Sequence, residues 1–130
     1  MTEHPNVQRM RDGYAAFAKG DLAAFDELWS DDIRWHNSGS SSVSGTFEGR
    51  PAIFEMFGKL FESTGGTLRI EPRGIVADDD WGFAAVTVTA SRGDQTLDTM
   101  DVHTVRLADG RVVEFWQTST DPYASDAFYG

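Results

Sequence analysis

The sequence predicts an α+β domain, with helices in the first half and an antiparallel sheet in the second. Apolar residues recur at helical spacing up to about residue 63, whereas from residue 67 onward short β-rich runs alternate with tight turns. The chain has 130 residues, and no linker or repeat divides it. We therefore expect a single domain over residues 1–130.

The first two helices are predicted on either side of a Lys-Gly-Asp turn at residues 19–21. Asn6 can cap the first helix. The apolar face of that helix comprises Val7, Met10, Tyr14, Phe17 and Ala18. Gly20 suits the left-handed position that ends a helix, and Asp21 can cap the second helix. The second apolar stripe comprises Leu22, Phe25, Leu28 and Trp29. His4 falls in an end that we expect to be disordered.

A short strand, a polar loop and a third helix follow. The run Ile33-Arg34-Trp35 ends in His36-Asn37 and is followed by a Gly- and Ser-rich loop. Pro51 suits the first turn of the third helix. The apolar face of this helix comprises Ile53, Phe54, Phe57, Leu60 and Phe61. The polar strand end at His36 and Asn37 fits two interpretations, a solvated loop or the rim of a pocket.

The second half is predicted to form an antiparallel meander, because short turns join its strands. A broken strand covers 67–77, where Pro72 and Gly74 mark a bend or bulge. The acidic run at 78–80 lacks the further oxygen ligands that Ca²⁺ needs, so we interpret it as a turn. The remaining strands are expected at 81–91, 96–107 and 111–121.

Composition and charge exclude several functional classes. The chain has 21 acidic and 11 basic residues, a net charge of −10, which argues against a nucleic-acid or anionic-membrane partner. No apolar run approaches the ~18 residues of a membrane span, and the N-terminus lacks the apolar core of a signal peptide. With no Cys and no metal motif such as HExxH, we expect no metal and no cofactor. We predict a cytoplasmic protein.

Three motifs, in order, resemble the SnoaL-like branch of the NTF2-like superfamily. They are FAKGDLAAFDELWSDDIRWH, SGTFEGRPAI, and RLADGRVVEFW with Asp121 behind it. The resemblance extends from about Val7 to Phe128. It implies an NTF2-like cone, in which three N-terminal helices pack on a curved sheet that encloses a deep apolar pocket, and a homodimer packed through that sheet. The superfamily contains ketosteroid isomerases, polyketide cyclases and non-catalytic binders, so the fold alone does not determine function.

The strand at 96–107 carries the first pocket candidates. Alternation places Asp101 and His103 on one face, and both faces mix polar with apolar residues, so alternation leaves open which face is buried. The resemblance places His103 where ketosteroid isomerases keep a pocket carboxylic acid that donates to the substrate oxygen. It therefore implies that this face lines the pocket. Asp101 can orient an imidazole or stabilise its charged form.

Two positions depart from the isomerase pattern. Asn37 aligns with the proton-shuttling Asp of the isomerases, and an amide cannot act as a general base near neutral pH. The oxyanion Tyr of the isomerases aligns with Gly13, whereas Tyr14 is one place further on and is turned by about 100°. These departures argue against steroid-type isomerisation. They leave His36 and His103 as acid–base candidates, because imidazole titrates near pH 6.5.

Aromatic and amide side chains complete the predicted pocket. Trp35 is expected to form a wall. On the last strand, Phe115 and Gln117 should face the pocket if the hairpin before them contains no bulge, and Trp116 should then face outward. The aromatic tail is expected to cover the pocket mouth through Phe128 and Tyr129.

These residues predict a cofactor-independent SnoaL-like enzyme that acts by proton transfer on an apolar, carbonyl-containing small molecule, as an isomerase, cyclase or dehydratase. The catalytic candidates are His36 and His103, one of which would be the general base, and Asp101. The substrate-binding candidates are Tyr14, Trp35, Asn37, Phe115, Gln117 and Phe128. The alternative is a binding protein with the same pocket and no chemistry, which the absence of Asp at position 37 supports. Only the size of the chain supports a protein-interaction role.

Overall fold

The computed structural model describes residues 2–130. The elements are α1 (Pro5–Lys19), the 3₁₀ turn η1 (Leu22–Ala24), α2 (Phe25–Leu28), β1 (Trp29–Asn37), β2 (Gly45–Glu48), α3 (Arg50–Ser63), β3 (Arg69–Ala77), β4 (Trp81–Arg92), β5 (Gln95–Ala108), β6 (Arg111–Ser119) and α4 (Pro122–Tyr129). The α+β class is confirmed. The expected set of three helices is only partly matched, because the second is little more than one turn and α4 is a fourth helix.

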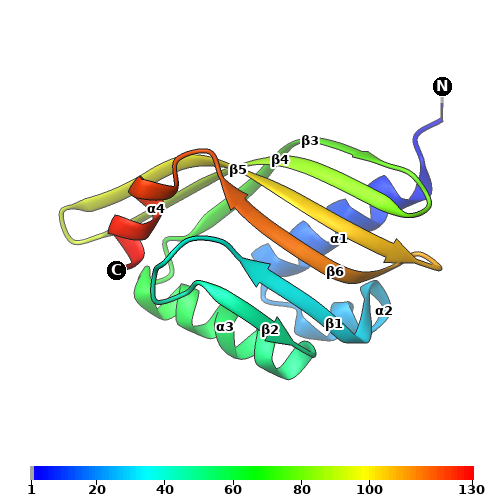
Figure 1. Ribbon diagram of the computed structural model, residues 1–130, viewed down its shortest axis with the longest axis horizontal. Coiled ribbons are helices and arrows are strands. Elements are labelled where there is room, and N and C mark those ends of the chain that lie inside the picture. The colour runs from blue at the N-terminus through cyan, green and yellow to red at the C-terminus, as the bar shows by residue number, and fades with distance from the viewer. Residues whose placement is uncertain (1) are drawn as a thin grey trace.

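All six strands form one sheet in the order β2-β1-β6-β5-β4-β3. Strands β3 to β6 are the expected antiparallel meander. Strand β1 pairs parallel with β6 and antiparallel with β2. Figure 1 shows the long twisted sheet with α1 passing behind it and α3 running beside the β1–β2 end. Helix α1 packs against β3 and β4, and α3 packs against β1 and β2.

The start of α1 differs from the prediction in two ways. Pro5, which has no N–H to satisfy, opens the helix, and His4 caps it by accepting a hydrogen bond from the Asn6 backbone N–H at 3.0 Å. Asn6 is buried inside the helix and donates to the Asp78 carbonyl at 3.0 Å. Nε2 of His4 lies 2.8 Å from Oδ1 of Asp79. The predictions that Asn6 caps the helix and that His4 is disordered were therefore wrong.

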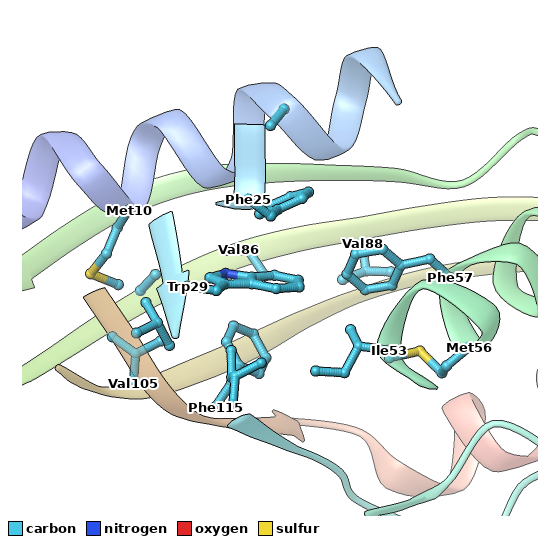
Figure 2. Packing of buried hydrophobic residues seen from close by; sticks show 14 of the residues in the cluster. Met10, Phe25, Trp29, Ile53, Met56, Phe57, Val86, Val88, Val105 and Phe115 are labelled. Carbon is cyan, nitrogen blue, oxygen red and sulfur yellow. The ribbon is translucent and has the colours of Figure 1, made fainter. Parts of the chain in front are cut away.

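The second predicted helix ends one residue early. Gly20 is left-handed as expected, with φ of +68°, but Asp21 makes no side-chain capping bond. Trp29 is extended and begins β1 instead of ending the helix. Its buried indole stacks on Phe25 at 4.1 Å between ring centroids. Figure 2 shows Trp29 in the middle of the core, next to Phe25 and Phe57.

Three register shifts shape the sheet, of which one lies in the β1–β6 pairing between Trp29 and Arg34. The predicted bulge at Pro72–Gly74 in β3 is confirmed. A second bulge lies in the β5–β6 hairpin, where Leu107 pairs with Val112 but Arg106 pairs with Glu114. The acidic turn is also confirmed, because Oδ1 of Asp78 accepts the N–H groups of the two residues that close it.

Within residues 2–130, no helix is long and apolar enough to cross a membrane.

Candidate functional site

A cavity of about 120 Å³ lies between the helices and the inner face of the sheet. This is close to the ~150 Å³ that holds a benzene molecule in an engineered protein cavity. Most of the wall is apolar. Its aromatic members are Tyr14, Phe17, Phe25, Trp29, Trp35, Phe57, Phe115 and Tyr129. The space therefore suits a ring-sized apolar group, and the polar residues at the wall determine what else the cavity can recognise.

Strand β5 contributes the two titratable groups at the centre of the wall. Asp101 and His103 are 6% and 4% exposed, whereas their neighbours Met100 and Val102 lie on the exposed face. The strand has an unbroken pairing with β4, so its side chains alternate strictly from Gln95 to Arg106. The structure therefore buries the face that the resemblance implied.

His103 is a neutral imidazole with one free nitrogen. Its Nδ1 lies 2.8 Å from the Tyr14 hydroxyl, and the two rings stack with centroids 5.7 Å apart. Burial lowers the pKa of His103 to about 3. Among residues 2–130, no side chain or backbone group forms a hydrogen bond with Nε2. At neutral pH the ring is thus uncharged, and Nε2 is available to a ligand.

Tyr14 reaches the cavity from α1 despite its one-residue offset from the isomerase position. Both Gly13 and Tyr14 line the cavity. Burial, and secondly the charge of Asp101, raise the pKa of Tyr14 far above its ordinary value. The phenol therefore stays protonated and acts as a hydrogen-bond partner of His103.

Asp101 is held by one oxygen only. Its Oδ2 accepts a hydrogen bond from Nε2 of Gln117 at 2.9 Å. Its Oδ1 is buried without a partner in the described part of the chain. Burial raises the pKa of Asp101, against the opposing effects of the hydrogen bond from Gln117 and of the nearby Ser119 hydroxyl, which is not within hydrogen-bonding geometry. A buried carboxylate with a raised pKa is a stronger base than an exposed one. Buried oxygens are normally hydrogen-bonded, so Oδ1 of Asp101 is placed to accept a hydrogen bond or a proton from a ligand.

Strand β6 contributes Phe115 and Gln117 to the cavity wall. Their inward orientation was predicted on the condition that the hairpin contains no bulge. The hairpin does contain one, and both residues face the cavity nonetheless. The Gln117 amide oxygen accepts hydrogen bonds from the Ser38 N–H at 3.1 Å and the Ser38 hydroxyl at 3.3 Å. Gln117 therefore joins Asp101 to the residue that follows β1.

Trp35 and Asn37 line the cavity from β1. The Trp35 ring lies flat on Phe115, with centroids 3.6 Å apart and planes 9° apart. Its indole N–H donates to Oδ1 of Asn37 at 2.8 Å, and Nδ2 of Asn37 donates to the Val43 carbonyl at 2.9 Å. Both ends of the Asn37 amide are thus engaged, one with the Trp35 indole and the other with the loop after β1.

His36 lies on the opposite face of the sheet. Nδ1 is 2.9 Å from the Thr46 hydroxyl, Nε2 is 2.7 Å from Oε2 of Glu114, and the ring stacks on Trp116. The hydrogen bond from His36 is the main reason why the pKa of Glu114 is lowered. Strand alternation explains the placement, because Trp35 and Asn37 point inward and the residue between them must point outward. The structure does not bring the two predicted histidines together.

Residues of Ser38–Ser44, hereafter the mouth segment, and of α4 line one end of the cavity, which we interpret as its mouth. The Ser40 N–H donates to both carboxylate oxygens of Asp126, at 3.0 and 3.1 Å. The Ser42 N–H donates to the Gly130 carbonyl at 2.8 Å. Tyr129 lines the cavity, whereas Phe128 is buried beneath Arg92, whose guanidinium lies 4.8 Å from the ring centroid. Of the two aromatic residues expected to cover the pocket, Tyr129 therefore reaches the cavity wall and Phe128 does not.

Sequence reasoning missed helix α4 and its contacts with the mouth segment. The signal was present at Asp121-Pro122, a capping residue followed by proline at the first helical position. Oδ1 of Asp121 accepts the Ala124 N–H at 3.1 Å. Within residues 2–130, no group of three or more His, Asp or Glu side chains is placed to hold a metal ion.

Comparisons with known proteins agree with the fold. A family model described as a SnoaL-like domain matches residues 10–115. An uncharacterized protein of Mycobacterium tuberculosis is 27% identical over 130 residues, covering 99% of each chain. The structure of Bal32a, from a soil-derived mobile gene cassette, superposes with a TM-score of 0.91 at 34% identity over 96% of both chains. A putative SnoaL-like polyketide cyclase from Jannaschia sp. CCS1 has the same fold, with a TM-score of 0.81 at 18% identity over 100% of this chain and 98% of that one.

Proposed function

Because the chain belongs to the SnoaL-like family, we propose that it is a cofactor-independent enzyme that moves a proton on an apolar, carbonyl-containing small molecule. The observation that carries this proposal is the pair of polar groups in the aromatic cavity. Asp101 keeps one buried oxygen without a partner, and His103, two residues away on the same face of β5, keeps Nε2 free. The reaction class is isomerisation, cyclisation or dehydration through an enolate.

Asp101 is the base in this proposal. Burial raises its pKa, which brings the proton affinity of the carboxylate closer to that of a carbon acid. Oδ1 removes the proton next to the carbonyl, the C–H electron pair becomes the new C=C bond, and the π pair of the C=O bond moves onto the carbonyl oxygen. In an isomerisation, Oδ1 then returns the proton at a second carbon. In a cyclisation, the enolate carbon forms a C–C bond to a second carbonyl carbon, and the oxygen of that carbonyl takes the proton from Oδ1. In a dehydration, a C–O bond breaks and the leaving hydroxide takes that proton to form water.

His103 is the donor to the developing oxyanion. With a pKa of about 3 it is a poor base at neutral pH, but a neutral imidazole that accepts from Tyr14 at Nδ1 carries its hydrogen on Nε2. That N–H can stabilise the enolate oxygen in a water-poor cavity. His36 has no part in the proposed reaction, because its ring lies on the outer face with both nitrogens engaged.

The test is proton exchange. Cyclic ketones that hold one or two rings are incubated in D₂O with the protein, and loss of the α-proton signal is followed by NMR. We expect the protein to accelerate exchange for a subset of ketones. Asp101→Asn should lower this rate by about 10²-fold or more. Asp98→Asn, on the exposed face of the same strand, is the matched control and should retain the wild-type rate. Binding without acceleration for every ketone would refute the proposal.

The second candidate is a ligand-binding protein without chemistry. Asn37 favours it, because the residue that aligns with the isomerases' catalytic Asp is an amide whose two ends hold Trp35 and the Val43 carbonyl. A binding protein should be purified with its ligand or bind one unchanged. Native mass spectrometry before and after incubation with candidate ketones distinguishes the two functions.

A homodimer through the outer face of the sheet is also proposed. Large apolar side chains are exposed there, namely Trp81, Phe83, Met100 and Val102. Burying such a patch is favourable. Light scattering should give about twice the mass of one chain, and Phe83→Glu should reduce it toward that of a monomer.

A further inference from the structure

We propose that Gln117 is the positioning residue of the site: it keeps Oδ2 of Asp101 bound to the protein, leaves Oδ1 for the substrate, and makes this assignment depend on the mouth segment. The inference rests on the proposed function in one respect, since that function gives Asp101 the role of base. The placement itself rests on three hydrogen bonds that join β5, β6 and the mouth segment.

The orientation of the Gln117 amide follows from its neighbours. The Ser38 backbone N–H can only donate, so the group that faces it at 3.1 Å must be the amide oxygen. The amide NH₂ must then face Asp101, where it lies 2.9 Å from Oδ2. A flipped amide would set two donors against each other at Ser38. It would also set an oxygen against the carboxylate.

This orientation makes the two carboxylate oxygens of Asp101 different. Oδ2 always receives a donor from Gln117, so a proton added to the carboxyl group goes to Oδ1. Oδ1 has no partner in the described part of the chain. The atom that takes up a proton is thus selected by a residue that need not touch the substrate at all.

The same bonds link the base to the cavity mouth. Ser38 begins the mouth segment, and its N–H is shared between the Gln117 side chain and the Gln117 backbone carbonyl. Two residues later, the Ser40 N–H is held by Asp126 of α4. When the mouth segment leaves α4 to admit a ligand, Gln117 loses the acceptor contact that fixes its amide. The base is then fully oriented only when the mouth is closed.

Other titratable groups face Asp101 and must be considered in any titration. His103 lies beside it on β5, Tyr14 faces it from α1, and Asp126 and Tyr129 line the cavity from α4. Burial is the main reason why the pKa of Tyr14 and that of Tyr129 are raised, and the charge of Asp101 is the second reason for both. Neither phenol titrates near Asp101. Asp126 is the other carboxyl group in the cavity wall, so the NMR measurement must resolve its signal from that of Asp101.

The experiment measures the pKa of Asp101 directly, from the ¹³Cγ shift of the intact protein, with Asp101→Asn as the assignment control. Gln117→Met keeps the side-chain length but removes the donor. We expect the pKa of Asp101 to rise by about one pH unit or more in this variant, because a hydrogen bond to the charged form is lost. Thr118→Val, on the exposed face of β6, should leave it unchanged. An unchanged value in Gln117→Met would overturn the proposal.

A second variant guards against misfolding of the first. Gln117→Glu is nearly isosteric and places a second carboxyl group against Asp101, so the pair should share a proton and the pKa of Asp101 should rise further. If the protein enolises a ketone, the acid limb of its kcat/KM profile should move upward with the NMR value, while KM changes little. An acid limb that stays in place while the pKa of Asp101 moves would overturn the positioning role. The NMR titration needs no turnover, so it tests Gln117 even if every ketone fails as a substrate.

Discussion

The Tyr14 hydroxyl lies 2.8 Å from Nδ1 of His103, and this contact joins the first helix to the central strand β5 across the cavity. The phenol has one hydrogen, and a neutral imidazole accepts at only one nitrogen. When Tyr14 donates to Nδ1, the imidazole hydrogen lies on Nε2. A residue of α1 thereby determines which group His103 offers to a ligand.

Tyr14→Phe should therefore affect both stability and exchange. The variant leaves Nδ1 of His103 buried without a partner, which costs about 1–3 kcal/mol of the free energy of unfolding. It also frees the imidazole to place its hydrogen on either nitrogen, so exchange should fall by about tenfold. Urea unfolding and the deuterium assay measure the two effects. Tyr123→Phe is the matched control, because Tyr123 is 86% exposed. Wild-type stability in Tyr14→Phe would show that the contact contributes nothing.

Because His103 is buried, we expect the protein to lose stability in mild acid. Its pKa is about 3 in the folded state, against about 6.5 in an unfolded chain. Between these values the unfolded state binds a proton that the folded state excludes, so the contribution of His103 to stability is lost as the pH falls from about 6.5 to about 3. The slope approaches ~1.4 kcal/mol per pH unit.

Urea unfolding at several pH values tests this slope. Asp101 acts in the opposite direction, because its raised pKa gives a contribution that is present at low pH and lost as the pH rises through its folded value. Comparing the wild type with His103→Gln removes the Asp101 effect, since both proteins retain that residue. The variant should show the shallower decline between pH 6.5 and 4. Parallel curves would mean that His103 is protonated without penalty in the folded protein.

Asp101→Asn should make the protein more stable and less active. The folded pKa of Asp101 is raised by burial, so the ionised carboxylate is disfavoured in the folded state at neutral pH. An amide of the same shape removes that cost and still accepts from Gln117. The thermal midpoint should therefore rise at pH 7 and change less at pH 4, while proton exchange is lost. If the variant is less stable than the wild type at pH 7, burial of the ionised Asp101 carboxylate does not cost stability.

Strand alternation explains which site residues could be predicted. The β5 strand runs without a break opposite β4, so Asp101 and His103 had to share a face once that face was known to be buried. The three consecutive candidates Trp35, His36 and Asn37 could not all reach one pocket, because successive side chains of a strand point to opposite sides. The sequence motif predicted where this strand ends, but only the sheet shows that Trp35 points inward and His36 outward.

The contacts of the mouth were beyond sequence reasoning for a different reason. The tail was expected to cover the pocket, and Tyr129 does line it. The partners of the tail come from Ser40 and Ser42, more than eighty residues earlier. Serines in a polar loop carry no periodic signal, so nothing in the sequence indicated that their N–H groups would meet the Asp126 carboxylate and the Gly130 carbonyl.

The final prediction concerns His36. Because its ring lies on the outer face, replacing it should lower stability without changing proton exchange. His36→Ala removes the hydrogen bond that chiefly lowers the pKa of Glu114, leaving that carboxylate with Arg34 at 3.7 Å and Arg106 at 3.6 Å. The pKa of Glu114 should rise toward its ordinary value, as ¹³C NMR can measure.

A lowered carboxyl pKa stabilises the fold above about pH 4.5 and ceases to do so as the pH falls through the folded value. The cost of the variant at pH 7 should be about 0.2–1 kcal/mol, the range found for pairs of partly exposed side chains. Proton exchange should stay at the wild-type rate, whereas His103→Gln should reduce it; a large loss of exchange in His36→Ala would mean that the outer face takes part in the reaction after all.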